Sequence, residues 1–331
     1  MALTIYDIAK IAGVSIATVS RVFNNPDSVT ESTRNRILQI AQKNGYHPQA
    51  FAQALASKRT KSIAVIVPVL SNYFFMEILS GIQDQLIESE SELVLVNIMS
   101  GVDAFQQVQY QVKRRWADGY ILISTHLTNE QYEELGSCQI PIVLIDDYHP
   151  NYDTVTTDNV EGAYLATKHL LDQGVRNVAM ISASKLSAPI KLRIKGYKKA
   201  LDEFDLFDES LIFYGNSDYR DGFSEQNGYE AMIQLLDSDP QPDACFCTSD
   251  IKGIGALKAM RERNIEIPMI CYDNLSVSRY IGLSTVAQPM QQMGSKAVTI
   301  LLDRIQNPSN LRSNVTFTPS LAIRDSFVSQ S

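Results

Sequence analysis

The chain has 331 residues, of which 45% are apolar and 20% charged, and its formal net charge is −8 at pH 7. This composition is typical of a globular protein with two or three domains and excludes a mainly disordered chain. No apolar run approaches the roughly 18 residues that a membrane-spanning helix needs, and the start, "MALTIYDIAK", lacks the features of a secretion signal. We therefore expect a cytoplasmic protein with no membrane partner.

The charge is divided unevenly along the chain. Residues 1–60 contain seven Lys or Arg and three Asp or Glu, a balance of +4, so the remaining residues carry −12. A small basic segment on a large acidic body is typical of a protein that meets nucleic acid at one end.

Apolar residues recur at helical spacing three times near the start of the chain. Thr4 and Asp7 form a capping pair for the first helix, and Gly13 supplies the turn that follows it. Ser15 is placed to cap the second helix and Thr30 the third. Two short helices joined by a tight turn, with a third that closes their core, form a helix-turn-helix module.

The second helix has two different faces. Val19, Val22 and Phe23 are expected to face the core. The opposite face carries Ala17, Ser20 and Arg21, flanked by Ile16 and Thr18. Small residues permit a close approach, hydroxyls bond bases or phosphates, and arginine pairs with guanine or phosphate. A helical cap on an enzyme is the alternative, but this face favours DNA binding.

The segment "TIYDIAKIAGVSIATVSRVFNN" resembles the amino-terminal signature of the lactose-repressor (LacI/GalR) family of bacterial transcription regulators. The resemblance implies that the second helix lies in the major groove of an operator. The DNA contacts that it implies in this module are Thr4, Tyr6, Ser15, Ile16, Ala17, Thr18, Ser20, Arg21 and Asn24. Ile16 and Ala17 occupy the variable pair that helps to set operator choice.

The next segment, "GYHPQAFAQALASKRTK", contains strong helix formers but is too short to be a stable helix alone in water. In the family it is the hinge helix, which docks in the minor groove and wedges a leucine between base steps. Leu55 holds that position, and Ala52 and Ala56 permit a close approach. Gln49 and Gln53 depart from the residues that are usual there, and a plain linker is the alternative.

The acidic body alternates short Val- and Ile-rich runs with amphipathic segments, which indicates parallel sheets built from βαβ units. Two series of runs predict an α/β fold with two lobes that split near residue 160, the chain crossing back near 290. Ligands bind beyond the carboxyl ends of the strands in such sheets. The nucleotide-binding and nucleophile motifs of enzymes are absent, so we expect neither catalysis nor a cofactor.

The body also resembles the type I periplasmic-binding-protein fold, which serves this family as effector domain. The effector contacts that the resemblance implies are Ser71, Tyr73, Phe74, Asp146, Arg193, Phe223, Ser249 and Asp273. An arginine, two carboxylates, hydroxyls and aromatic rings suit a sugar or a related polyol. Asp250 is open to two interpretations, because it follows Ser249 but could also cap the next helix.

The four cysteines fit a reducing compartment, and the spacing of Cys245 and Cys247 places both on one face of a buried strand. No Cys or His pair has ligand spacing, so no metal site is expected. The carboxyl-terminal segment has no leucine heptads, so we expect a homodimer without a coiled-coil tetramer.

These patterns predict a helix-turn-helix domain at 1–46, a hinge helix and linker at 47–60, and an effector-binding and dimerisation domain at 61–331. The expected protein is a transcription regulator, a repressor, that binds a near-palindromic double-stranded DNA operator under the control of a small carbohydrate effector. A sensor of small molecules without a DNA function, or an activator that uses the same sites, remains the alternative.

Overall fold

The computed structural model describes residues 3–46, 59–70, 72–87, 89, 91–98, 103–183, 187–215 and 222–327. The chain forms two compact units. The smaller unit comprises Met1–Ser62 with Arg115–Asp118, and the larger one comprises Ile63–Arg114 with Gly119–Ser331. No helix in these described ranges is long and apolar enough to cross a membrane.

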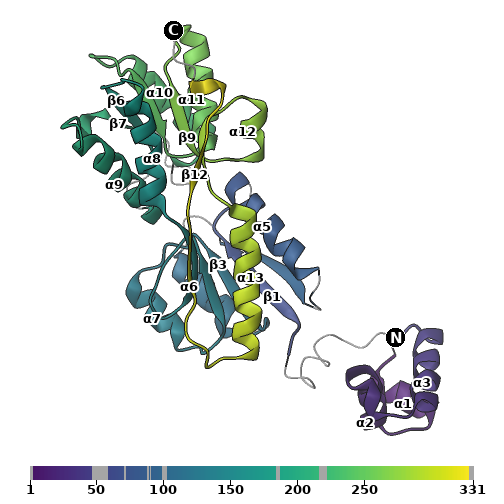
Figure 1. Cartoon of the computed structure of the whole chain (residues 1–331). Coiled ribbons are helices and arrows are strands. Elements are labelled where there is room, and N and C mark those ends of the chain that lie inside the picture. Colours follow the sequence, from purple (N-terminus) through teal and green to yellow (C-terminus); the bar gives the residue numbers. More distant parts are fainter. Residues whose placement is uncertain are drawn as a thin grey trace. The chain divides into compact units, whose positions relative to one another are not determined.

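The smaller unit is helical (Figure 1). Its elements are α1 (Ile5–Ala12), α2 (Ile16–Asn24), the 3₁₀ helix η1 (Pro26–Ser28) and α3 (Glu31–Lys43). Gly13 ends α1 with a φ of 65°, and this left-handed conformation permits the tight turn into α2. The predicted helix-turn-helix order is therefore confirmed.

The predicted caps of the first two helices are confirmed, whereas that of the third is not. The backbone N–H of Thr4 donates to the Asp7 carboxylate at 2.9 Å, and the Thr4 hydroxyl accepts from the Asp7 N–H. The Ser15 hydroxyl accepts from the Thr18 N–H at 3.1 Å. Thr30 stands at the start of α3, but its hydroxyl donates to the Thr33 hydroxyl and caps no backbone group.

The core of the smaller unit forms where the three helices meet. Val19 and Val22 of α2 are buried against Ile8 of α1 and Ile37 of α3, as their spacing predicts. Leu38 lies outside this cluster and its side chain is 41% exposed. The apolar face of α2 is thus occupied by the core, which leaves its opposite face to solvent.

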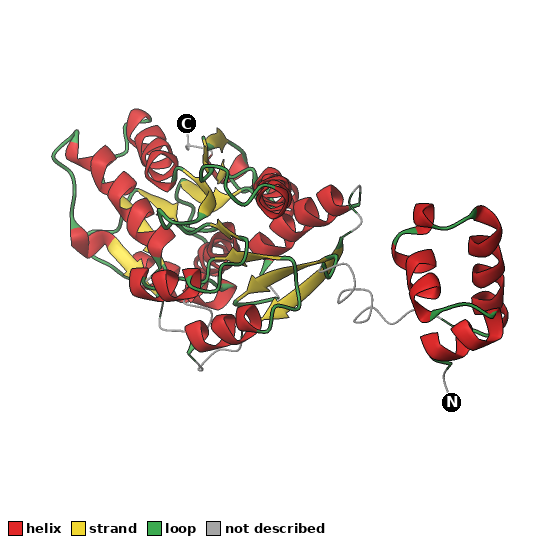
Figure 2. Ribbon diagram, turned by 90° about the horizontal axis from the view of Figure 1, so that it is seen from below, coloured by secondary structure: helices red, strands yellow, loops and turns green. Residues whose placement is uncertain are grey.

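The first lobe of the larger unit is a six-stranded sheet in the order β11-β5-β4-β3-β1-β2. Its strands are β1 (Ser62–Val67), β2 (Glu92–Asn97), β3 (Gly119–Ile123), β4 (Ile142–Ile145), β5 (Asp153–Thr157) and β11 (Asn314–Phe317). Its helices are α5 (Tyr73–Leu86), α6 (Ala104–Lys113), α7 (Asn129–Gly136) and α13 (Met290–Gln306). The runs of Val and Ile in β1, β3 and β4 are buried because helices cover the sheet (Figure 2).

The second lobe repeats this plan with the strand order β12-β10-β9-β8-β6-β7. Its strands are β6 (Val178–Ser182), β7 (Ile212–Tyr214), β8 (Ala244–Cys247), β9 (Met269–Asp273), β10 (Thr285–Ala287) and β12 (Ser320–Ala322). Its helices are α8 (Asn159–Asp172), α9 (Ala188–Asp202), α10 (Glu225–Leu236), α11 (Asp250–Arg263) and α12 (Ser276–Tyr280), with the 3₁₀ helices η2 (Glu209–Leu211) and η4 (Asp325–Phe327). Cys245 and Cys247 pack into the same core cluster, which confirms that they share a face of β8.

The chain passes between the two sheets three times. It leaves the first lobe between β5 and α8, returns between β10 and α13, and crosses again between β11 and β12. The sequence predicted the first two passages near residues 160 and 290. The third was missed because β11 and β12 are short and carry no long apolar run.

Paired helices in each lobe pack at close range through glycines. A Cβ added to Gly81 of α5 would lie 1.9 Å from the carbonyl oxygen of Gln291 in α13. In the second lobe, a Cβ added to Gly255 of α11 would lie 1.8 Å from the carbonyl oxygen of Glu225 in α10. Any side chain at these positions would push the helices apart, so the glycines fix the spacing of the helices on the sheets.

Candidate functional site

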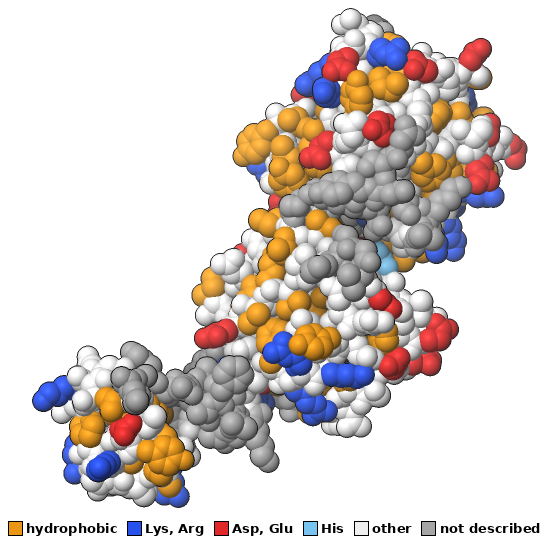
Figure 3. All heavy atoms as spheres, turned by 180° about the vertical axis from the view of Figure 1, so that it is seen from behind, with side chains coloured by type: hydrophobic (Ala, Val, Ile, Leu, Met, Phe, Trp, Pro, Cys, Tyr) orange, Lys and Arg blue, Asp and Glu red, His pale blue; other side chains and the backbone are white. Residues whose placement is uncertain are grey.

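The solvent face of α2 is the first candidate site. Of the residues predicted there, Ser15, Ile16, Ala17, Arg21 and Asn24 are exposed, while Thr18 and Ser20 are half-buried. Arg21 forms no ion pair within the described ranges. On the face drawn in Figure 3, Lys and Arg side chains are prominent on the smaller unit. The exposed face of α2 therefore combines small side chains with one cation, Arg21.

Hydroxyls on this face bond within the helix. The Ser15 and Thr18 hydroxyls are 2.9 Å apart, and the Asn24 amide donates to the Ser20 hydroxyl at 3.1 Å. These short bonds fix the rotamers of the polar side chains while their remaining lone pairs and N–H groups stay available. A partner therefore meets a face that is already ordered.

The first turn of α1 contributes two predicted residues. Tyr6 is 67% exposed, so its ring and hydroxyl are accessible. The Thr4 hydroxyl is engaged in the capping box with Asp7, and these bonds lower the pKa of the Asp7 carboxyl. Thr4 is therefore exposed but already bonded. The predicted hinge residues Ala52, Leu55 and Ala56, and Ser71 of the effector set, lie outside the described residues.

Arg193 of α9 is the centre of the second candidate site, in the larger unit. Its side chain is buried, Nε donates to Asn159 Oδ1 at 2.8 Å, and Nη1 donates to the carbonyl oxygen of Thr248 at 2.5 Å. Its guanidinium carbon lies 3.8 Å from the centroid of the Tyr272 ring. These contacts hold the planar guanidinium against the carboxyl ends of β8 and β9.

Two carboxylates from different lobes accompany Arg193. Asp273 Oδ1 lies 3.8 Å from Arg193 Nη1 and accepts from Gln288 Nε2 at 2.8 Å. Asp146 follows β4 in the first lobe, and its Oδ2 accepts from Ser124 at 2.8 Å. Burial raises the pKa of Asp273 to about 8 and also raises the pKa of Asp146, while Arg193 acts to lower both. Arg193 therefore has Asp273 within ion-pair distance and also influences the pKa of Asp146 in the other lobe.

Both aspartates have unusual backbone conformations, with φ of 57° at Asp146 and 124° at Asp273. Non-glycine residues are uncommon in this half of conformational space, and such positions concentrate at functional sites. The backbone turns at the ends of β4 and β9 thus direct carboxylates to the site at an energetic cost.

Ser249 and Asp250, adjacent in sequence, have different roles in the structure. The Ser249 hydroxyl is buried and has no hydrogen-bond partner among the described residues. The Asp250 carboxylate accepts from the backbone N–H of Leu275 and from the hydroxyls of Ser278 and Thr285. Asp250 therefore ties α11 to α12 and β10, so neither of the two sequence interpretations, cap or ligand contact, describes its bonds.

The predicted aromatic residues are divided between core and surface. Tyr73, at the start of α5, is 50% exposed. Phe74 is half-buried, packs against the core of the first lobe and meets Phe75 edge to face at 5.6 Å between ring centroids. Phe223 is half-buried just before α10. Of the three, Tyr73 has the most accessible ring.

Unpartnered polar atoms gather at the carboxyl ends of the strands. The buried atoms without a hydrogen-bond partner in the described residues are Asp146 Oδ1, Gln288 Oε1 and the hydroxyls of Ser182, Ser187, Thr248, Ser249 and Tyr272. Each lies within one residue of the end of a strand or directly before the next helix. Leaving so many buried polar atoms unsatisfied is costly, which is typical of a site that a polar ligand completes.

Sequence reasoning missed Ser182, Thr248, Tyr272 and Gln288. The only sequence feature that could have identified them is their position, since each lies at the carboxyl end of a strand in the second lobe. No group of three or more His, Cys, Asp or Glu in the described ranges could hold a metal.

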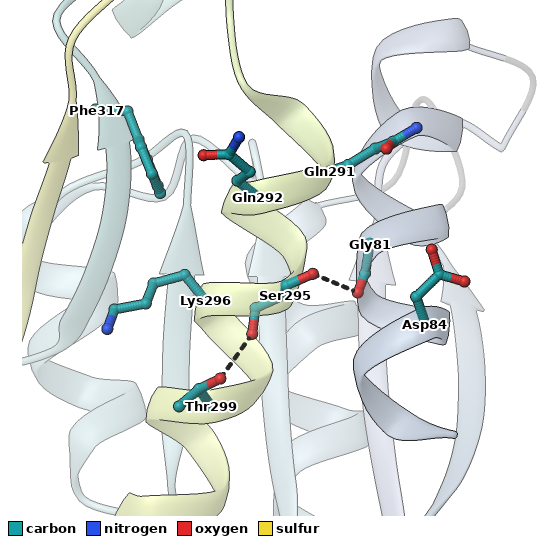
Figure 4. Close-up of a pocket in the computed structure, with 8 residues that line it drawn as sticks. All are labelled: Gly81, Asp84, Gln291, Gln292, Ser295, Lys296, Thr299 and Phe317. Carbon is teal, nitrogen blue, oxygen red and sulfur yellow. Dashed lines mark hydrogen bonds between the residues drawn. The ribbon is translucent and has the colours of Figure 1, made fainter. Parts of the chain in front are cut away.

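A surface pocket of about 450 Å³ lies elsewhere on the first lobe, between α5 and α13 (Figure 4). Gly81, Asp84, Gln292, Lys296 and Phe317 are among the residues that line it. Two lining hydroxyls, of Ser295 and Thr299, donate to backbone carbonyl oxygens of the paired helices. This pocket shares no residue with the strand-end site and contains none of the predicted contacts.

The chain is similar to known regulatory proteins along nearly its whole length. A model of bacterial regulatory proteins of the lacI family matches residues 4–49, and one of a periplasmic binding protein-like domain matches residues 167–327. The chain is 31% identical over 332 residues to the HTH-type transcriptional repressor PurR of Mannheimia succiniciproducens, with 98% of each covered. It is 34% identical over 330 residues to Catabolite control protein A of Priestia megaterium, with 96% of this chain and 97% of that protein covered. The solved complex of the transcriptional regulator CelR with cellobiose is 26% identical and matches with a TM-score of 0.73, covering 98% of this chain and 99% of that one.

Proposed function

Because the chain belongs to the lacI family of bacterial regulatory proteins, we propose that it represses transcription from an operator under the control of a small sugar-like effector. The family relationship gives a DNA-binding transcription regulator. The observation that carries the effector part is the group of Arg193, Asp146 and Asp273 among buried polar atoms without partners.

The division of labour that we propose follows the predicted boundaries. Residues 1–46 bind the major groove through the exposed face of α2, with Arg21 as the cation and Ile16 and Ala17 as the pair that selects the operator. Residues 47–60 act as a minor-groove hinge, with Leu55 as the wedge and Ala52 and Ala56 beside it. Residues 61–331 bind the effector and dimerise.

The chemistry of the strand-end site supports a ligand with several hydroxyls. Asp146 and Asp273 accept hydrogen bonds, the Arg193 guanidinium donates them, and the Ser249 hydroxyl can do either. The ring of Tyr73 offers an apolar face to the C–H side of a sugar. The complex of CelR with cellobiose, in a related chain of almost the same length, supports the same class of ligand.

Coupling between the sites follows from the two-lobed fold. Asp146 belongs to the first lobe, whereas Arg193 and Asp273 belong to the second, so a ligand that bonds to all three favours one arrangement of the lobes. That preference passes to the hinge and changes operator affinity by no more than the difference in effector affinity between the two arrangements. A two-fold dimer then requires a near-palindromic operator.

Footprinting on the promoter of the protein's own gene tests the DNA half of the proposal. We expect a protected near-palindrome, with Leu55→Ala weakening specific binding far more than non-specific binding, because only the specific complex contains the kinked step. Affinity should fall steeply with salt, since phosphate contacts release counterions. Equal losses in specific and non-specific binding would refute the wedge, and a reporter that rises with the protein would show activation.

Calorimetric titration with sugars tests the effector half. Arg193→Ala should abolish binding of any sugar that the wild-type protein binds, because the guanidinium joins the acceptor groups of the site. Arg261→Ala, which changes an exposed arginine of α11, is the matched control and should leave affinity unchanged. Unchanged affinity in Arg193→Ala would remove that residue from the site.

A further inference from the structure

Lys252 of α11 is a fully buried cation. Its ammonium donates to the carbonyl oxygen of Ser182 at 2.6 Å and also to Asn227 Oδ1. Both acceptors are neutral, and no carboxylate in the described ranges forms an ion pair with it. An ammonium has three N–H groups, so these two neutral bonds leave one donor and the charge without a partner among the described residues.

This arrangement is costly for the protein as it stands. Burial lowers the pKa of Lys252 to about 8, with the nearby Cys247 acting in the opposite direction, so the side chain is mostly protonated at neutral pH. A buried cation without a counter-charge is strongly disfavoured in the interior of a protein. Arg193 differs, because a carboxyl group, that of Asp273, lies 3.8 Å from its Nη1.

A second observation concerns an unused hydrogen-bonding group on a residue that Lys252 bonds. The hydroxyl of Ser182 is buried without a partner in the described part of the chain, and it belongs to the residue whose carbonyl oxygen accepts from the ammonium. Ser182 ends β6, which pairs with β8, the strand that leads to Thr248 and Ser249. The ammonium and the hydroxyl therefore share the strand-end edge on which Arg193 bonds to Thr248.

We propose that the effector carries an anionic group, a carboxylate or a phosphate, whose charge is neutralised by Lys252 and whose oxygens accept from the Ser182 hydroxyl. The inference rests on the proposed function, because it assigns a charge to the ligand of the same strand-end site. The ligand is then a sugar acid or a sugar phosphate, with its hydroxyls at Arg193, Asp146 and Asp273 and its anion at Lys252. A purely structural lysine, bonded only to Ser182 and Asn227, is the competing explanation.

Calorimetry on the full chain with matched ligands distinguishes these explanations. The probes are glucose, glucuronate and glucose 6-phosphate, with ribose and ribose 5-phosphate as a second set. The anionic member of one set should bind at least about tenfold more tightly than its neutral partner, the size expected of a charge-assisted contact. Preference for glucuronate over glucose 6-phosphate, or the reverse, identifies the anion as a carboxylate or a phosphate.

Two variants assign the effect to the proposed residues. Lys252→Met should reduce affinity for the anionic probe to about that for the neutral one, and Ser182→Ala should weaken it several-fold while leaving the ammonium in place. Lys258→Met, which changes a lysine of α11 whose side chain is 70% exposed, is the matched control and should retain the preference. If Lys252→Met does not fold, Ser182→Ala still tests the proposal.

The outcomes separate this inference from the proposed function. Neutral and anionic probes that bind equally, in wild type and in both variants, but are lost in Arg193→Ala would overturn the anionic group and leave the proposed site intact. Binding that survives Arg193→Ala as well would overturn the site. A wild-type protein that binds none of the probes would overturn both the sugar class and its charge.

Discussion

Ser249 and Asp250 test the assignment of buried polar groups to folding or to ligand binding, because substitution of these adjacent residues should affect different properties of the protein. Asp250→Ala removes a fully buried carboxylate that accepts from the Leu275 N–H at 2.8 Å and from Ser278 and Thr285 at 2.6 Å and 2.5 Å. Ser249→Ala removes a hydroxyl that has no partner in the part of the chain that the structure describes. The first change should affect folding and the second only ligand binding.

The expected size follows from the three donors that Asp250→Ala strands. Each buried donor left unsatisfied costs about 1–3 kcal/mol, and donors that share one acceptor are not additive. Burial raises the pKa of Asp250 to about 6, so its charged form is already disfavoured and part of the loss is recovered. We expect a loss of about 3 kcal/mol of unfolding free energy for Asp250→Ala, and a change within about 0.5 kcal/mol for Ser249→Ala.

Urea unfolding of the full chain, followed by circular dichroism, measures both losses, and calorimetry with a bound sugar measures affinity. Asp250→Ala should lower the midpoint of the transition of the larger unit, while Ser249→Ala should keep the midpoint and weaken the ligand. An Asp250→Ala variant as stable as wild type would refute the structural role of its three bonds. A large stability loss in Ser249→Ala would show that its hydroxyl has a partner in the folded protein.

Three further predictions concern Asp273, Gly255 and Thr4. Burial raises the pKa of Asp273 from 3.8 to about 8, so the native state binds this proton more tightly than the unfolded chain, and the resulting stability is lost as the pH rises toward 8. The unfolding free energy should therefore fall by about 1.4 kcal/mol per pH unit between pH 6 and 7 in urea titrations, and Asp273→Asn should remove this fall. An identical pH slope in wild type and variant would contradict the burial of a neutral carboxyl. Gly255→Ala should lower the melting temperature by several degrees through about 1–3 kcal/mol of overpacking against Glu225, and an unchanged calorimetric transition would refute the close helix contact. Thr4→Ala should cost about 1 kcal/mol in the smaller unit through the lost bond to Asp7, seen as faster hydrogen exchange in α1, and unchanged exchange would count against the cap.

Local patterns in the sequence were sufficient to predict the helix-turn-helix and the alternation of strands and helices in the larger unit. Caps and turns act over three or four residues, so Thr4, Gly13 and Ser15 are readable without tertiary structure, and the structure agrees. Apolar periodicity placed Val19 and Val22 in a core for the same reason. Arg193 and Asp273 were reached through the family resemblance, and the structure brings them together.

The roles of several buried residues depend on partners that lie far away in the sequence. The acceptor role of Asp250 depends on Leu275, Ser278 and Thr285, which lie 25 to 35 residues away in the chain. Tyr272 reads as one more apolar residue of a buried strand until the fold sets its ring against Arg193.

Lys252 is another residue whose environment the sequence does not reveal, since a lysine in a helix is expected to be exposed to solvent. The sequence by itself determined the helix-turn-helix, the α/β class and the strand ends, because capping, turns and apolar periodicity are properties of neighbouring residues. Only the tertiary structure decided which polar groups are paired and which are left for a ligand, because burial and pairing depend on residues far apart in the chain.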